Sequence, residues 1–482
     1  MSRAGDLLSP QPRAAARELL RLAGPLIAVS ASRMLMGFID FVMVSRLGTD
    51  AQAAISPAAL LVWGFLGIGM GAATSVQTFA SQADGRGEPE RGAAYTWQTL
   101  YLALGFAPVA VLAMLVIPPL YEWIGTLARH TATVRALEVS YTRVAVWSLV
   151  PAVLACGLES FFNGIQRPRI TLVAVLVSLV VNAAGNWLLI WGNLGFPRLG
   201  IAGAGLATVI GWWSRVLTLF VVFCSPGFDR RYGTRTAWAP SWRKCVDIFY
   251  VGGPTSAGWL LDIGAWIVFL NLIVPLFGTA ALAATNIALQ YTHLAFMPAI
   301  GLGLALCSQV GFAIGAGRLE EAVHRTRIAL MLTMVYMGTI GLLLFLFRRP
   351  LLWIMNDDPG VLSVGAWIMC WVAIYQAFDA MSITFIFALR GAGDTRVPAV
   401  LNGLCCWGLF IGGGLLVARL LPSLGVHGPW LMAVAYLTVL GPLLYWRYRS
   451  GAWRRMRVFS ETRATGIPAT EAALPTGLTS QS

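Results

Sequence analysis

Long apolar stretches recur along the chain, and each has the length of about 20 residues that an α-helix needs to cross a bilayer. Short segments between them hold most of the charges. Charged residues make up only 11% of the chain, whereas a soluble domain carries roughly 25%. So little charge cannot cover the surface of a soluble protein of 482 residues. Lipid must therefore be the solvent for most of this chain.

The apolar pattern predicts an all-α membrane protein with twelve spanning helices. The expected spans are residues 22–46, 52–80, 93–119, 133–162, 168–191, 200–224, 245–275, 281–310, 323–347, 361–389, 397–420 and 427–447.

The distribution of positive charge predicts the orientation of these spans. Most of the 34 Lys and Arg residues fall at the N-terminus, in alternate loops and near the C-terminus. Since such loops stay in the cytoplasm, we expect both termini there, which agrees with an even number of spans. Residues 1–21 are basic, and the apolar run after them is too long for a signal peptide. We expect a multi-pass protein of the bacterial inner membrane.

The two halves of the sequence repeat. Four landmarks of the first half return in the second half at nearly one offset, which predicts two six-helix bundles related by a pseudo-two-fold parallel repeat. We interpret the glycine pair at one of these landmarks as a tight turn. The landmark pairs are Gly24-Pro25 and Gly253-Pro254, Gly48-Thr49 and Gly278-Thr279, Gly85-Arg86-Gly87 and Gly315-Ala316-Gly317, and Asn163-Gly164 and Arg390-Gly391.

These observations predict how the chain is divided. The expected parts are a cytoplasmic N-terminus (1–21), an N-terminal lobe (22–224), a cytoplasmic linker (225–244), a C-terminal lobe (245–448) and a disordered cytoplasmic tail (449–482).

Several functions are disfavoured by what the sequence contains. The net charge of +13 does not indicate nucleic-acid binding, because the basic residues lie in short segments between apolar runs. The seven cysteines and four histidines show no metal-ligand spacing. The sequence has no HExxH, GxSxG or phosphate-binding Gly-Lys-Ser/Thr motif. We therefore expect neither an enzyme nor an ATP-driven pump.

Three acidic residues lie deep within apolar runs: Asp40, Asp262 and Asp379. An ionised side chain at mid-bilayer costs at least about 2.5–3.5 kcal/mol, so such groups usually face a bundle interior or a wet cavity. A carboxyl group there can bind H⁺ or Na⁺ reversibly, or pair with a cationic substrate. A structural ion pair is the alternative for any one of them. Three acids spread over both halves favour the functional reading.

Polar residues at helical spacing accompany two of these acids. Asn182 and Asn186 lie four residues apart, on one helical face, and either line a polar cavity or join helices. Tyr375 lies four residues before Asp379, so its hydroxyl can reach that carboxylate. The alternative for Tyr375 is a role in packing.

Arg33 is a positive charge within the first span, seven residues before Asp40 and thus about 10 Å from it along the helix. We expect Arg33 to form a static pair with an acid on another helix, such as Glu159, or to hold an anionic group of the substrate. Glu138, Glu159 and Asp247 lie near predicted helix ends, where we expect them to reach the interface.

Five stretches together resemble the multidrug and toxic compound extrusion (MATE) family, in its NorM-like branch, over about residues 15–450. They are GFIDFVMVSRLG, the QADGRG corner, NGIQRPRITLVAVLVSLVVNAAGNWLLIWGNLG with IAGAGLAT after it, GGPTSAGWLLD, and VAIYQAFDAMSITFIFALRGAGDTRVP.

The resemblance implies a fold and a function. The fold would be similar to two six-helix bundles that form a V, the MATE/MOP-type fold. The protein would be a secondary antiporter that exports cationic or amphipathic organic compounds in exchange for Na⁺ or H⁺. By the resemblance, Asp40, Asn182 and Asn186 match the polar cluster of the N-terminal lobe, and the remaining three predicted residues match the cation site of the C-terminal lobe: Asp262, Tyr375 and Asp379.

Three positions depart from the family pattern. The acid of the seventh span is usually Glu and here is Asp262, which leaves Na⁺ and H⁺ both open as coupling ion. The usual Ala-His-Gln run of the eighth span reads Ala284-Thr285-Asn286. Arg33 stands at a position that is usually neutral, and its charge would repel a nearby cation. We expect it to shift substrate preference toward zwitterions or anions.

An exporter or flippase of a lipid-linked or anionic metabolite, from the same superfamily, is the alternative function. Arg33 favours it, whereas twelve rather than fourteen spans and the Asp pattern favour the antiporter. We expect no cofactor, and no metal except Na⁺ at Asp262 and Asp379. The expected partners are small organic substrates, Na⁺ or H⁺ and the lipid bilayer, with the protein as a monomer.

Overall fold

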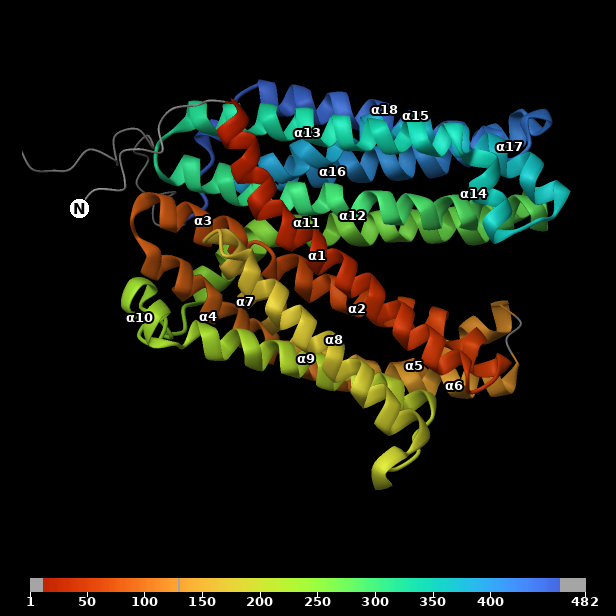
Figure 1. Cartoon of the computed structure of the whole chain (residues 1–482), viewed down its shortest axis with the longest axis horizontal. Coiled ribbons are helices and arrows are strands. Elements are labelled where there is room, and N and C mark those ends of the chain that lie inside the picture. Colours follow the sequence, from red (N-terminus) through yellow and green to blue (C-terminus); the bar gives the residue numbers. More distant parts are fainter. Residues whose placement is uncertain (1–11, 129–130, 460–482) are drawn as a thin grey trace, which may run out of the picture. The chain divides into compact units, whose positions relative to one another are not determined.

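A computed structural model of the chain describes residues 12–128 and 131–459, and these fold into helices (Figure 1). Twelve helical segments are long and apolar enough to cross a membrane, as the sequence predicts. They begin and end within a few residues of the expected spans, except that the first helix starts at Pro12 rather than near residue 22. The basic segment before the first apolar run is therefore helical from Pro12 on.

In the first half of the chain the helices are α1 (Pro12–Ser45), α2 (Thr49–Ala73), α3 (Val76–Arg86), α4 (Pro89–Gly105), α5 (Ala107–Ala128), α6 (Ala132–Ala145), α7 (Leu149–Gly164), α8 (Pro168–Trp191), α9 (Ile201–Phe223) and α10 (Pro226–Tyr232). In the second half they are α11 (Trp242–Val268), α12 (Thr279–Gly315), α13 (Leu319–Leu346), α14 (Arg348–Met355), α15 (Pro359–Ala392), α16 (Arg396–Leu404), α17 (Gly414–Leu420) and α18 (His427–Arg449).

Two π-helical segments lie within the spans of the second half. A π-helical stretch, Phe269–Ile273, follows α11. A longer one, Cys405–Gly413, joins α16 to α17. π-helical segments widen a helix locally and occur frequently at functional sites.

The described chain divides into two compact units. The N-unit consists of residues 22–80 and 89–260, and the C-unit consists of 12–21, 81–88 and 261–459. Helix α11 thus belongs to the N-unit up to Leu260 and to the C-unit from Leu261. These units differ from the lobes expected at 22–224 and 245–448, which describe the repeated halves of the sequence and stay a prediction.

In the N-unit, α8 and α9 lie side by side and α9 also packs on α6 and α7 (Figure 1). In the C-unit, α15 packs on α12, α13 and α18. Small side chains make the closest helix contacts possible. A Cβ atom at Gly185 of α8 would lie only 3.1 Å from the Ala207 side chain of α9.

The glycines of the repeated landmarks 85–87 and 315–317 have two roles. The sequence predicted only the first role, a tight turn. Gly87 and Gly317 have φ angles of +75° and +73° and form the expected turns. Gly85 and Gly315 are helical instead. A Cβ at Gly85 would lie 2.2 Å from the Phe312 carbonyl oxygen, and one at Gly315 would lie 2.1 Å from that of Gln82. Both lie in the C-unit, where they allow helix backbones to touch in a reciprocal way.

The first residues after α18 are packed, contrary to the expected disorder from residue 449. Trp453, Val458 and Phe459 are buried, and the Arg86 guanidinium lies 4.6 Å from the Phe459 ring centre. The expectation is therefore wrong for residues 449–459, where Arg449 ends α18 and Trp453 stacks on Tyr448. The remaining tail, 460–482, lies outside the described residues, as do residues 1–11.

Candidate functional site

The first candidate site surrounds the Asp40 carboxylate in the N-unit. The Asn186 amide nitrogen donates to Asp40 Oδ1, and Asn186 Nδ2 also lies 3.4 Å from Asn182 Oδ1. The Thr208 hydroxyl lies 3.4 Å from Asp40 Oδ2, and Tyr141 borders the same group. The structure thus brings together the three residues that the sequence assigned to one cluster. Asp40 is half-buried, whereas both amides are buried.

Small residues explain how three helices reach one carboxylate. Gly185 lies between the two asparagines of α8 and allows the close approach of α9. A Cβ atom at Gly211 of α9 would lie 3.2 Å from Asn182 Cβ and 3.3 Å from Met36 Cε of α1. Because side chains larger than glycine would separate the helices there, this packing sets the positions of the donors around Asp40.

The second feature of the N-unit is a triad of charged residues, in which Glu159 and Arg215 are buried and Arg33 is partly exposed. Arg33 Nη2 donates to Glu159 Oε2, which confirms the pairing that the sequence suggested. Arg215 of α9 approaches the other carboxylate oxygen of Glu159, with a distance of 3.5 Å from Nη1 to Oε1. Arg215 also lies 3.4 Å from the Ser178 hydroxyl, and its guanidinium stacks on the Trp212 ring at 4.3 Å.

The expectation that three acids reach the interface is wrong. Glu138, Glu159 and Asp247 are exposed by 0%, 3% and 1%. Asp247 accepts a hydrogen bond of 2.7 Å from the Tyr95 hydroxyl, and Glu159 serves two arginines. Their helices continue beyond them, so these acids are held by partners inside the protein rather than by water at a helix end.

The third feature is the pair Asp262 and Asp379 in the C-unit. The two carboxylates lie close enough to influence each other electrostatically, and each is half-buried. Within the described part of the chain, Asp262 of α11 has one weak donor, the Cys406 thiol, whose sulfur lies 3.8 Å from Oδ1. Cys406 belongs to the π-helical stretch 405–413. Two neighbouring carboxylates with so few hydrogen-bond donors favour the binding of a cation or a proton.

The predicted hydrogen bond from Tyr375 to Asp379 is not present among the described residues. The Tyr375 hydroxyl donates instead to Thr292 Oγ1, at 3.1 Å. Tyr375 still lies close to the acid pair, as does the buried Tyr436 of α18. Both tyrosines are more than nine-tenths buried. The structure therefore confirms the proximity of Tyr375 but not the contact that the sequence suggested.

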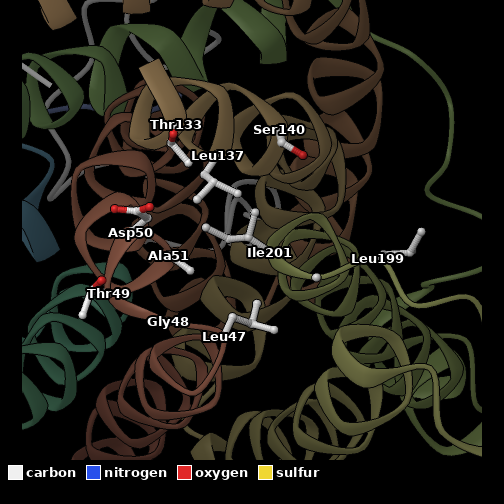
Figure 2. A pocket seen from close by; sticks show the side chains of 11 residues that line it. Leu47, Gly48, Thr49, Asp50, Ala51, Thr133, Leu137, Ser140, Leu199 and Ile201 are labelled. Atoms are coloured by element: carbon white, nitrogen blue, oxygen red, sulfur yellow. The ribbon is translucent and has the colours of Figure 1, made fainter. Parts of the chain in front are cut away.

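A cavity of 420 Å³ lies away from these residues, in the N-unit (Figure 2). Figure 2 shows the oxygens of Asp50, Thr133 and Ser140 around a space that Leu137 and Ile201 also border. The cavity is formed by the α1–α2 turn, the start of α6 and the segment that enters α9. These segments lie at the ends of the spans that are predicted to face the outside of the membrane. It includes none of the predicted site residues.

Sequence reasoning missed Thr208, Arg215, Cys406 and Tyr436. Arg215 carries the same signal as Arg33, a charge within an apolar run, and could have been found by it. The other three residues are common in apolar helices and only the folded arrangement places them beside a carboxylate.

A sequence profile of the MatE family matches residues 25–188 and 265–414. The probable multidrug resistance protein NorM of Idiomarina loihiensis is 28% identical over 443 residues, which cover 90% of this chain and 93% of that protein. The probable NorM protein of Chromobacterium violaceum is 29% identical and covers 92% of this chain, with 95% of its own length matched.

Solved structures share the fold. MATE in the straight conformation superposes with a TM-score of 0.82, at 19% identity, over 92% of this chain and 97% of that one. The eukaryotic MATE transporter AtDTX14 gives 0.79 at 18% identity, over 96% and 100% of the two chains. The family match covers both halves and includes Asp40, Asn182 and Asn186, as well as Tyr375 and Asp379. The chain is thus a member of the MatE family, the multidrug and toxic compound extrusion family that its motifs resemble.

Proposed function

We propose that this protein is a secondary active antiporter that exports cationic or amphipathic organic compounds in exchange for Na⁺ or H⁺. The observation that carries the proposal is the pair Asp262 and Asp379, two half-buried acids within spanning helices that have few hydrogen-bond donors. Each carboxylate is costly to keep charged without a cation nearby. A cation that binds there and is later released supplies the exchange that export requires.

Asp40 is proposed as the second coupling group. Its donors are neutral amide and hydroxyl groups rather than cations, so its charge stays uncompensated within the cluster. Protonation removes that charge, and a cationic substrate would compete with the proton for the same carboxylate. The relatives named as multidrug resistance proteins agree with this function.

We further propose that the protein acts as a monomer in the bacterial inner membrane, with both termini in the cytoplasm. The concentration of Arg and Lys in alternate loops supports this orientation. A tag at either terminus that becomes accessible only after the inner membrane is permeabilised would agree with it.

The test is transport in liposomes that contain the purified protein. A Na⁺ gradient and a pH gradient are imposed separately, and uptake of a fluorescent cation is followed. We expect one of the two gradients to drive uptake in the wild type, and Asp262→Asn and Asp379→Asn to abolish it. Asp50→Asn, which changes an exposed acid at the start of α2, serves as the control. Unchanged transport in both C-unit variants would refute the proposed role of the pair.

A further inference from the structure

The triad of Arg33, Glu159 and Arg215 contains more positive than negative charge. Two guanidinium groups share one carboxylate, which leaves one positive charge without a carboxylate in the triad. Arg215 is 1% exposed, and its Nε atom is buried with no hydrogen-bond partner among the described residues. The same holds for Nε of Arg33. Because an arginine presents several donors in a planar fork, the triad has more donors than Glu159 can satisfy.

The two arginines differ in exposure. The side chain of Arg215 is enclosed, whereas that of Arg33 is 36% exposed in the N-unit. Glu159 holds one edge of the Arg33 guanidinium, and Arg215 in turn holds Glu159. These two contacts fix the direction of the Arg33 side chain, and part of that side chain stays accessible.

The face of α1 that carries Arg33 is distinct from its most exposed apolar face. Leu35 and Phe38 are exposed by 47% and 63%, and at about 100° per residue they lie on the other side of the helix from Arg33. Asp40 lies two turns along from Arg33, on nearly the same face. A guanidinium in contact with hydrocarbon is strongly unfavourable. The accessible part of Arg33 therefore has to face water or a ligand.

We infer that Arg33 is a binding residue for an anionic group of the transported compound, with Glu159 and Arg215 as residues that position it. A guanidinium fork recognises a carboxylate in preference to a neutral group of the same shape. The inference rests on the proposed function, since the ligand is the compound that is exported.

The position of Asp40 narrows the class of ligand further. Asp40 lies about 10 Å from Arg33 along α1, and its cluster supplies no cation of its own. A compound with an anionic group at Arg33 and a cationic group toward Asp40 satisfies both sites. The preferred ligand is thus an amphipathic zwitterion rather than a simple anion.

The test uses two dyes that differ in one group. Rhodamine 19 carries a free carboxylate, and rhodamine 6G is its ethyl ester. Binding of each to the purified protein is measured by fluorescence polarisation, without any gradient. We expect Arg33→Gln to weaken binding of rhodamine 19 by about tenfold and to change that of rhodamine 6G by less than about twofold. Arg33→Lys, which keeps the charge but not the fork, should give an intermediate loss for rhodamine 19 only.

Arg143→Gln is the matched control, because Arg143 is an exposed arginine of α6 in the same unit; it should leave both dyes unchanged. Arg33→Gln leaves Glu159 paired with Arg215, so the fold should persist, and its melting temperature verifies this. If that variant does not fold, Arg33→Lys decides the question. An equal change for both dyes, or no change for either, overturns the inference.

The experiments distinguish a failure of the Arg33 site from a failure of the proposed antiport. Selective loss of the carboxylate dye supports the Arg33 site even if no ion gradient drives transport. Conversely, gradient-driven export of both dyes with no selective effect at Arg33 supports the antiporter and refutes the site.

Discussion

The N-unit and the C-unit hold their buried charges in different ways. In the N-unit, Glu159 is shared by two arginines and the Asp40 carboxylate receives an amide and a hydroxyl donor. In the C-unit, Asp262 and Asp379 have one long contact from a thiol. Among the described residues, the two N-unit clusters are thus rich in donors, and the acid pair of the C-unit is poor in them.

The difference indicates how each region responds to a cation. Hydrogen-bond donors lower the cost of the negative charge on a carboxylate, so Asp40 depends less on an ion than an acid with few donors does. Two acids that lie close together with few donors are stabilised only when a cation or a proton joins them. The C-unit pair is therefore the stronger candidate for direct cation binding, and the N-unit clusters are the better candidates for orienting a substrate.

The largest expected effect concerns cation binding by the C-unit. The double variant Asp262→Asn/Asp379→Asn should weaken binding of the coupling ion by more than about 100-fold, because the attraction between a cation and a carboxylate at 4 Å is about 4 kcal/mol in a partly buried site. Isothermal titration of the purified protein with Na⁺, or measurement of proton release, provides the affinity. Asp40→Asn should weaken ion binding far less than the double variant does, because the C-unit pair stays intact. If Asp40→Asn removes ion binding as completely, the contrast between the units is wrong.

The second effect is on stability. Glu159→Gln leaves the enclosed Arg215 without its carboxylate, and removing one member of a buried ion pair costs about 3–5 kcal/mol. We expect a clear fall in the melting temperature of the protein in detergent.

A matched control for that prediction lies in the C-unit. Glu321 also bridges two arginines, Arg318 and Arg325, but its side chain is 21% exposed. Glu321→Gln should cost less, about 1 kcal/mol, because water reaches Glu321 and ion pairs near the surface contribute little. Equal losses in the two variants would show that burial does not determine the strength of these triads.

A third comparison concerns the side chains that donate hydrogen bonds to Asp40 and Asp262. Asn186→Leu removes the amide that donates to Asp40, and a hydrogen bond to a charged group contributes about 1.5–3 kcal/mol. We expect at least about a tenfold lower initial rate of gradient-driven dye transport. Cys406→Ala removes only a weak thiol donor and should reduce the rate by less than about twofold. Cys370→Ala, whose thiol contacts its own helix backbone, is the control for the thiol change. A larger effect at Cys406 than at Asn186 would reverse the comparison.

The smallest expected effect is at Tyr375. Because its hydroxyl donates to Thr292, Tyr375→Phe should lower the transport rate by less than about threefold, and Thr292→Val should behave similarly. Initial rates under one fixed gradient measure both. A loss in Tyr375→Phe that equals that of Asp379→Asn would mean that the hydroxyl acts on the carboxylate after all.

The sequence predicts the helices well because each span is a long apolar run that has no other favourable state in lipid. It also predicts the Asp40 cluster, since Asn182 and Asn186 lie at helical spacing within one span. It does not predict the partners of Tyr375 or Asp262, because Thr292 and Cys406 lie on other helices and carry no distinctive signal. The division into units is also not visible in the sequence, since it separates residues within the continuous helix α11.

That continuity has a mechanical consequence. Helix α11 contributes residues to both units, with the boundary between Leu260 and Leu261. Pro254 removes a backbone hydrogen bond about two turns earlier in the same helix. Asp262 follows this boundary by one residue, so an ion bound to its carboxylate acts on a helix that both units share.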